Sequence, residues 1–168
     1  TSLPGACAAV TALTLSGLST RRFCFEAFLP ADKKARRQIL KELKTETRTI
    51  ILYEAPHRLA RTLEELTAEF GNRKLTILRE LTKKHETVFQ TTLSEAAKFY
   101  RTEEPKGECV LVLEGVDVKV LETQEHEKWN EIPLTEHLDR YLQQGMTQKE
   151  AMKAVALDRG VSKREIYA

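Results

Sequence analysis

Two hydrophobic spacings alternate along the first 115 residues of this chain. Short apolar runs rich in β-branched or aromatic residues predict buried strands at 23–29, 48–54, 74–81 and 109–115, and the alternating segment 85–93 favours another strand. Apolar residues three to four positions apart predict helices from Pro4 or Gly5 to about residue 15, after Asp32, over 57–70 and from Ser94 to Tyr100. Strands that alternate with helices predict an α/β domain over residues 1–116.

The pattern changes after this domain. Residues 117–131 are polar, lack a clear period and are expected to form a linker. Three helices are then predicted over 132–168: one from Pro133 to Gly145, one capped by Thr147 and ended by Gly160, and one capped by Ser162. The succession resembles a helix-turn-helix, so we expect a small helical tail with that arrangement.

Composition narrows the class of protein. The chain has 168 residues and a net charge of only +2, so any nucleic-acid surface must be a local patch. Its three cysteines lack metal-ligand spacing, which predicts reduced thiols in a cytoplasmic protein and no metal site. No apolar run approaches the roughly 20 residues of a membrane span, so no membrane segment is expected. Glycine-rich phosphate-binding fingerprints, serine hydrolase patterns and zinc-protease patterns are all absent.

Charged residues gather where the predicted strands end, which is where open α/β sheets bind ligands. Tyr53-Glu54 ends one strand, and Arg79-Glu80, with Lys83 shortly after, ends another. Gly107-Glu108 precedes its strand and meets the other two segments only if that strand runs antiparallel to them. The alternative is a set of mutual salt bridges at the sheet edge.

Basic residues concentrate in two further places. The patches contain Lys33, Lys34, Arg36 and Arg37 in the second helix, and Lys149, Lys153, Lys163 and Arg164 in the tail. Both are candidate phosphate contacts, and the alternative is a solvated helix face. The four histidines have no partner at metal-ligand spacing and are expected to be ordinary polar residues.

Four motifs carry a family resemblance. LPGACAAVTALTLSGLSTRRFCFEAFLP, RTIILYEAPHRLARTLEEL, RELTKKHETV and KGECVLVLEG occur in this order. Together they resemble the carboxy-terminal half of the ribosomal RNA small subunit methyltransferase I family, in the tetrapyrrole methylase superfamily. The resemblance implies a mixed sheet with flanking helices and S-adenosylmethionine as cofactor. It also implies 2′-O-methylation of a cytidine in the decoding region of 16S ribosomal RNA on the small ribosomal subunit, by a homodimer.

The resemblance further implies a missing amino-terminal domain, with the cofactor in the cleft between the two domains, so that this chain is inactive alone. Cofactor contacts are then expected from the start of the first helix and from two strand ends, namely Pro4, Gly5, Cys7, Ala8, Tyr53, Glu54, Gly107 and Glu108. Glu80 and Lys83 become candidates for accepting the hydroxyl proton, and Arg79 for contacting RNA. Two alternatives stay open: a methylase of corrin or porphyrin precursors, and a nucleic-acid-binding module without catalysis.

Overall fold

A computed structural model describes Thr1 and residues 5–167, which form two compact units, residues 1–116 and 117–168. The first unit is a five-stranded mixed sheet in the order β1-β2-β5-β3-β4. Only β1 and β2 run parallel; β5 lies antiparallel to both β2 and β3, and β4 antiparallel to β3. Its elements are α1 (Ala8–Leu15), β1 (Phe23–Phe28), α2 (Lys33–Leu43), β2 (Thr49–Glu54), α3 (Pro56–Phe70), β3 (Lys74–Arg79), β4 (Thr87–Thr92), α4 (Leu93–Phe99) and β5 (Cys109–Leu113).

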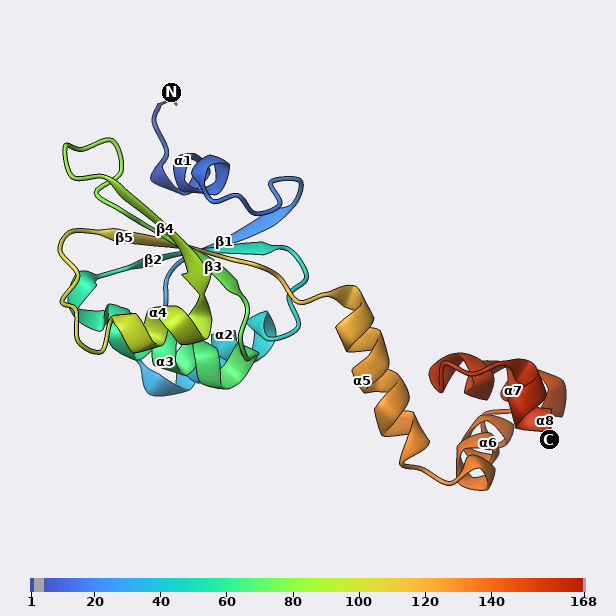
Figure 1. The fold of residues 1–168 in the computed structure, drawn as a ribbon. Coiled ribbons are helices and arrows are strands. Elements are labelled where there is room, and N and C mark those ends of the chain that lie inside the picture. Colours follow the sequence, from blue (N-terminus) through green and yellow to red (C-terminus); the bar gives the residue numbers. More distant parts are fainter. Residues whose placement is uncertain (2–4, 168) are drawn as a thin grey trace. The chain divides into compact units, whose positions relative to one another are not determined.

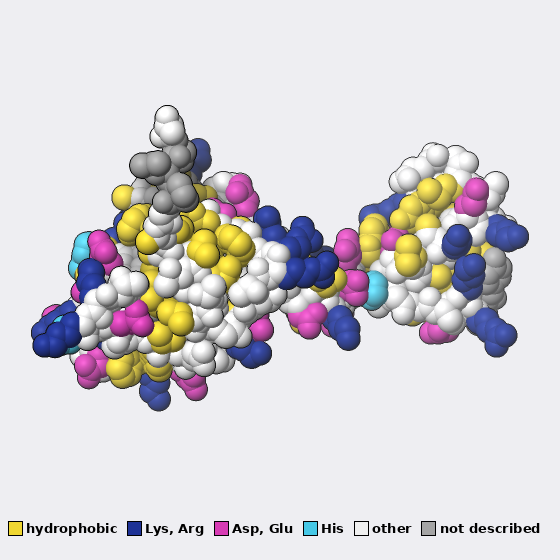
Figure 2. All heavy atoms as spheres, turned by 90° about the horizontal axis from the view of Figure 1, so that it is seen from above, with side chains coloured by type: hydrophobic (Ala, Val, Ile, Leu, Met, Phe, Trp, Pro, Cys, Tyr) yellow, Lys and Arg dark blue, Asp and Glu magenta, His cyan; other side chains and the backbone are white. Residues whose placement is uncertain are grey.

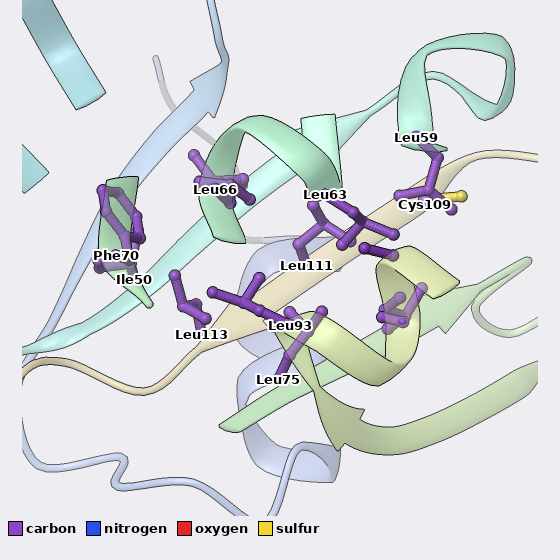
Figure 3. Close-up of a cluster of buried hydrophobic side chains, with 14 of the residues drawn as sticks. Ile50, Leu59, Leu63, Leu66, Phe70, Leu75, Leu93, Cys109, Leu111 and Leu113 are labelled. Atoms are coloured by element: carbon purple, nitrogen blue, oxygen red, sulfur yellow. The ribbon is translucent and has the colours of Figure 1, made fainter. Parts of the chain in front are cut away.

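Helices cover the two faces of this sheet unequally. Helices α2, α3 and α4 lie on one face and α1 alone lies on the other (Figure 1). The larger core fills the space between the sheet and α3 and α4, where Leu63, Leu93 and Leu111 are fully buried (Figure 3). Truncating one such leucine to alanine typically costs about 2–5 kcal/mol, so this core sets the stability of the first unit.

The α1 face is built from small side chains. Ala9, Ala12 and Leu13 pack against the other side of the sheet, including Val110 and Val112 of β5. Small residues let the helix backbone approach the strands closely, as the sequence predicted. The helix nevertheless starts at Ala8 instead of Pro4 or Gly5, because Cys7 is extended and serves as the N-cap. Pro4 lies outside the described residues.

The other predicted elements of the first unit need one correction. All five expected strands are present, and Asp32 caps α2 by accepting a hydrogen bond from the Ala35 amide at 2.8 Å. Helix α4 begins at Leu93, and its cap lies two residues before the expected cap Ser94, because the Thr92 side chain accepts a hydrogen bond from the Glu95 amide. A bulge in β1 sets Ala27 at φ +52° and shifts the register by one residue between Phe25 and Ala27.

The second unit is entirely helical in its described part. It contains α5 (Val118–Asn130), α6 (Leu134–Gln143), α7 (Gln148–Asp158) and α8 (Lys163–Tyr167). Thr147 and Glu150 form a reciprocal capping box at the start of α7, which explains the predicted helix start. Val155, Ala156 and Ile166 form its small core.

The segment expected as a linker is therefore helical over most of its length. Asp117 caps α5 through the Lys119 amide at 2.9 Å, and none of the described side chains of α5 is buried. A polar helix without an apolar stripe has no 3.6-residue hydrophobic period, so the pattern that identifies other helices is missing here.

Candidate active site at one edge of the sheet

The antiparallel direction of β5 brings the three charged segments to one edge of the sheet. In the strand register, Cys109 at the start of β5 lies opposite both Glu54 at the end of β2 and Arg79 at the end of β3. Gly107 and Glu108 therefore lie beside the ends of those strands, as the antiparallel arrangement required. Residues more than 50 positions apart in the sequence share this edge.

Glu80 is the centre of the contacts at this edge. Its carboxylate accepts hydrogen bonds from Lys83 Nζ at 3.1 Å and from the Glu108 amide at 3.3 Å. The Glu80 amide in turn donates to the Glu108 carbonyl at 3.3 Å. These contacts, Lys83 foremost, hold the pKa of the Glu80 carboxyl below its ordinary value. Glu80 is thus an ionised side chain that binds the β3–β4 turn to the start of β5.

The backbone at this edge adopts sparsely populated conformations. Glu80 and Thr82 have φ values of +50° and +63°, which side-chain-bearing residues adopt only at a cost of about 1–3 kcal/mol each. Gly107 has φ +81°, and a Cβ atom there would overlap the Glu80 carboxylate. Strain of this kind persists where the surrounding contacts fix the turn, and it is common at functional sites.

Tyr53 faces α1. Its hydroxyl accepts a hydrogen bond from the Ala9 amide at 3.1 Å, and its ring meets the edge of Phe25 with centroids 4.9 Å apart. Cys7, the N-cap of α1, makes no side-chain capping bond. The start of α1 therefore retains backbone N–H groups that are not bonded by the cap side chain, and these are suited to an anionic group.

Glu54 points the opposite way, because successive residues of a strand face opposite sides of the sheet. It is 1% exposed and accepts hydrogen bonds from Thr62 Oγ1 at 2.6 Å and the Ala55 amide at 2.9 Å, with Arg58 at 3.4 Å. The Glu54 side chain therefore does not share the α1 side of the sheet with Tyr53, and its expected contact with the cofactor stays a prediction. Glu54 holds the start of α3 against β2.

Arg36 is likewise a structural residue. It is 7% exposed, forms an ion pair with Glu65 and donates to Thr62 Oγ1 at 2.8 Å. Its neighbours Lys33, Lys34 and Arg37 are exposed on α2. The predicted basic surface of α2 therefore lacks Arg36, whose charge lies against α3.

The predicted basic residues of the tail all lie at the surface of the second unit. Lys149 and Lys153 are exposed on α7, and Lys163 and Arg164 on α8.

The second unit also contains a polar cluster that the sequence pattern did not predict. His137 is fully buried, stacks on Trp129 at a centroid distance of 4.1 Å, and bonds Asp158 at 3.1 Å. The available signal was its position within the apolar stripe of α6, one residue before Leu138.

Aromatic side chains gather on the α1 face of the first unit, where apolar atoms are visible at the surface (Figure 2). Phe23, Phe25 and Phe28 of the edge strand β1 are 41%, 46% and 56% exposed. The bulge in β1 keeps Phe28 beside Tyr53, with ring centroids 5.6 Å apart.

Three further properties of the described residues bear on the kind of site they can form. They include no group of three or more His, Cys, Asp or Glu side chains placed to hold a metal ion. Cys109 is buried, and burial raises the pKa of its thiol to about 11, so it is not a nucleophile near neutral pH. Within residues 5–167, no helix combines the length and apolar character needed to cross a bilayer.

Comparisons with known proteins agree with this architecture. Residues 1–97 match the family model described as Tetrapyrrole (Corrin/Porphyrin) Methylases. The methyltransferase CobJ has a similar fold, with a TM-score of 0.54 and 18% identity over 67% of this chain and 49% of that one.

Two curated relatives are more similar in sequence. The ribosomal RNA small subunit methyltransferase I of Halalkalibacterium halodurans is 47% identical over 165 residues, and that of Bacillus subtilis is 42% identical over 165 residues. The matches cover 98% of this chain but 56% of each relative. The chain thus spans little more than half the length of these curated relatives.

Proposed function

Because this chain belongs to the tetrapyrrole (corrin/porphyrin) methylase family, we propose that it is part of an S-adenosylmethionine-dependent methyltransferase acting on ribosomal RNA. The observation that carries the proposal is the 47% identity, over 98% of the chain, to a ribosomal RNA small subunit methyltransferase I. The proposed acceptor is the ribose 2′-hydroxyl of a cytidine in the decoding region of 16S ribosomal RNA. The enzyme would work as a cytoplasmic homodimer on the small ribosomal subunit.

In this proposal the chain supplies one wall of the cofactor site, and an amino-terminal domain supplies the other. The α1 side of the sheet edge fits the cofactor, because the N-terminus of α1 lacks a capping side chain and lies beside the Tyr53 hydroxyl. Backbone N–H groups near Cys7 and Ala8 would bind its carboxylate, and the ring of Tyr53 would border its nucleoside. Gly5 and the Gly107-Glu108 backbone complete the proposed wall, and the cofactor supplies a methyl group already activated on a sulfonium.

The chain's own residues then position the reactants. In-line displacement at an activated methyl group depends chiefly on orientation, which a rigid sheet edge provides. Glu80 is a weak proton acceptor, since Lys83 holds its pKa low. We therefore assign Glu80 to positioning: it orients Lys83 and the Gly107-Glu108 backbone, while Lys83 directs an ammonium group toward the acceptor strand.

Two surfaces are proposed to contact the RNA backbone. Lys33, Lys34 and Arg37 on α2 and the basic residues of α7 and α8 offer exposed cations. Such contacts bind phosphates with little sequence preference and weaken as salt rises. Base-specific selection of the target then requires groups other than these cations.

Methyl transfer from labelled S-adenosylmethionine tests the proposed function. The acceptors are undermethylated small ribosomal subunits, total transfer RNA and a corrin precursor, each offered to this chain and to the complete gene product. Label in small-subunit RNA with the complete product supports the proposal. Label in the corrin precursor supports a macrocycle methylase, and no label with any acceptor favours a binding module without catalysis. Label from this chain alone would contradict the need for a second domain.

A further inference from the structure

We propose that a hollow on the helix-covered side of the sheet edge binds one unpaired nucleotide of the RNA substrate. This inference rests on the proposed function, because it names a contact of that same substrate. The hollow has a volume of about 450 Å³ and lies between the end of β3, the end of α4 and the turn before β5. Its walls include Arg79, His85, Thr87, Phe99, Tyr100 and Lys106.

The hollow lies on the opposite side of the sheet from Tyr53. Arg79 is paired in register with Cys109, and Cys109 packs in the core on the α3 and α4 side together with Tyr100. Tyr53 instead packs with the α1 cluster. A group bound in the hollow would therefore lie on the opposite side of the sheet from Tyr53, and it would meet the proposed active site at Glu80 and Gly107, which also line the hollow.

Arg79 is the first reason to expect an anion there. Arg79 is partly buried as a residue and donates from Nε to Thr87 Oγ1 at 3.2 Å, yet its guanidinium has no carboxylate within 4.0 Å among the described residues. Arg36 and Arg58, by contrast, each contact a glutamate. A guanidinium without an ion-pair partner has donors available for a phosphate, which it can bind in a bidentate fork.

Phe99 is the second reason, because it offers a surface for a base. Its ring is 47% exposed although it ends a packed helix, and Tyr100 meets it edge-on at a centroid distance of 5.0 Å. Phe89 contacts the same ring at 5.4 Å, so its orientation is fixed from two sides. Bases of single-stranded RNA stack on rings of this kind.

The charges around the hollow orient the proposed nucleotide. Lys106 adds an ammonium group and His85 an imidazole ring to the walls, and three carboxylates also line the hollow. Glu103 and Glu104 share the α4–β5 turn with Lys106, whereas Glu80 is already bonded to Lys83. Glu103 and Glu104 disfavour phosphate at the α4–β5 turn, so the phosphate is expected at Arg79 on the β3–β4 side, with the base turned toward Phe99. A free phosphate would use Arg79 but would gain nothing from the aromatic ring.

The experiment measures binding of a fluorescein-labelled single-stranded oligoribonucleotide of about 10 nucleotides, a length typical of single-strand binding grooves. The protein is the 168-residue chain. Phe99→Leu removes the aromatic face and keeps an apolar side chain, and Phe99→Tyr restores the ring. Val88→Ala, a change at another exposed apolar residue that does not line the hollow, is the matched control. Arg79→Gln and Arg101→Gln form a second pair, since Arg101 is exposed and already paired with Glu64.

We expect Phe99→Leu to weaken binding about fivefold or more, with Phe99→Tyr and Val88→Ala close to the wild type. Arg79→Gln should lower the slope of log K against log salt by about 0.7, the value for one phosphate of a single strand, whereas Arg101→Gln should leave it unchanged. Wild-type binding with no effect of Phe99→Leu would overturn the subsite and leave the proposed function standing.

Two further results would also overturn the subsite. One is an effect of Arg79→Gln alone combined with competition by inorganic phosphate, which would identify a simple anion site. The other is absence of oligoribonucleotide binding by the chain. In both cases the methyl-transfer assay still decides the proposed function separately.

Discussion

Gly107 lies against the carboxylate of Glu80, so closely that a Cβ atom at residue 107 would overlap it. This pairing links two sequence motifs, because Glu80 follows β3 and Gly107 precedes β5. We expect Gly107→Ala to lower the free energy of unfolding by about 2 kcal/mol or more: an alanine at φ +81° is strained, and Glu80 must release Lys83 and the Glu108 amide. Urea unfolding measures the change.

A double-mutant cycle separates the two causes. In a Glu80→Ala background the overlap is gone, so Gly107→Ala should then cost only the conformational strain. Equal penalties for Gly107→Ala in both backgrounds would show that the position of the Glu80 carboxylate does not require a glycine at residue 107.

Arg36 and Arg37 are adjacent in sequence, but replacing them should change the free energy of unfolding by very different amounts. Arg36→Ala removes the ion pair with Glu65 and the bond to Thr62, but Glu65 is partly exposed and keeps Arg61 at 2.9 Å, so a loss of about 1–3 kcal/mol is expected. Arg37→Ala changes an exposed residue and should alter stability by less than about 0.5 kcal/mol. Urea unfolding of both variants checks the contrast, and similar losses would contradict the assignment of Arg36 to the fold.

Tyr53 connects the sheet to the start of α1 through one hydrogen bond. Tyr53→Phe keeps the ring contacts but leaves the Ala9 amide without its acceptor, which should cost about 1 kcal/mol. If α1 borders the cofactor, the same variant should weaken S-adenosylmethionine binding by the complete enzyme in isothermal titration calorimetry. Tyr100→Phe is the control for stability, because its hydroxyl has no hydrogen bond within the part of the chain that the structure describes. No difference between the two variants would remove Tyr53 from this role.

Strand and helix periods predicted most of the first unit, because its core is made by apolar residues at regular positions. The same periods could have separated Tyr53 from Glu54, since adjacent strand residues face opposite sides of a sheet. Grouping the two by proximity in sequence placed both side chains on one side of the sheet, whereas Glu54 faces α3. Hydrophobic periodicity could not predict the role of Arg36, because its partners Glu65 and Thr62 lie on another helix.

The remaining differences have equally local causes. Helix α5 has no apolar stripe, so only its cap and charges could have identified it. The hollow beside Arg79 depends on three segments that meet only after the sheet has formed. His137 appeared as a lone polar residue because Asp158, its partner, lies 21 positions away on α7.

The buried imidazole of His137 predicts acid sensitivity of the second unit. Burial holds its pKa below the ordinary value of 6.5, although the hydrogen bond to Asp158 opposes this shift. As pH falls through about 6.5, the unfolded chain takes up a proton that the folded chain does not bind, so stability falls. For one such group the slope of stability against pH is at most about 1.4 kcal/mol per pH unit.

Trp129 allows this prediction to be measured, because it is the single tryptophan of the chain and stacks on His137. Urea unfolding followed by its fluorescence should give a lower stability at acid than at neutral pH. The charged and polar groups facing the ring are Asp158, Arg159, Arg140 and Tyr141. His137→Gln should flatten the dependence between pH 5.5 and 7; an unchanged slope in that variant would assign the effect to another group.

The basic residues of the tail predict a specific change in salt dependence. Lys149 and Lys153 are exposed, four residues apart on one face of α7, and take part in neither the capping box nor the core. If both contact RNA phosphates, replacing the pair with glutamine should reduce the slope of log K against log salt by about 1.4, twice the value for one phosphate of a single strand. Lys119→Gln with Lys128→Gln removes the same charge from α5 in the same unit, where four glutamates of 122–131 surround the lysines and disfavour RNA. The slope should therefore fall for the α7 pair and stay constant for the α5 pair. Equal slopes for both double variants would show that Lys149 and Lys153 make no RNA contacts beyond those of any other lysine pair in this unit. The proposed phosphate contacts would then be left to α2 and the sheet edge.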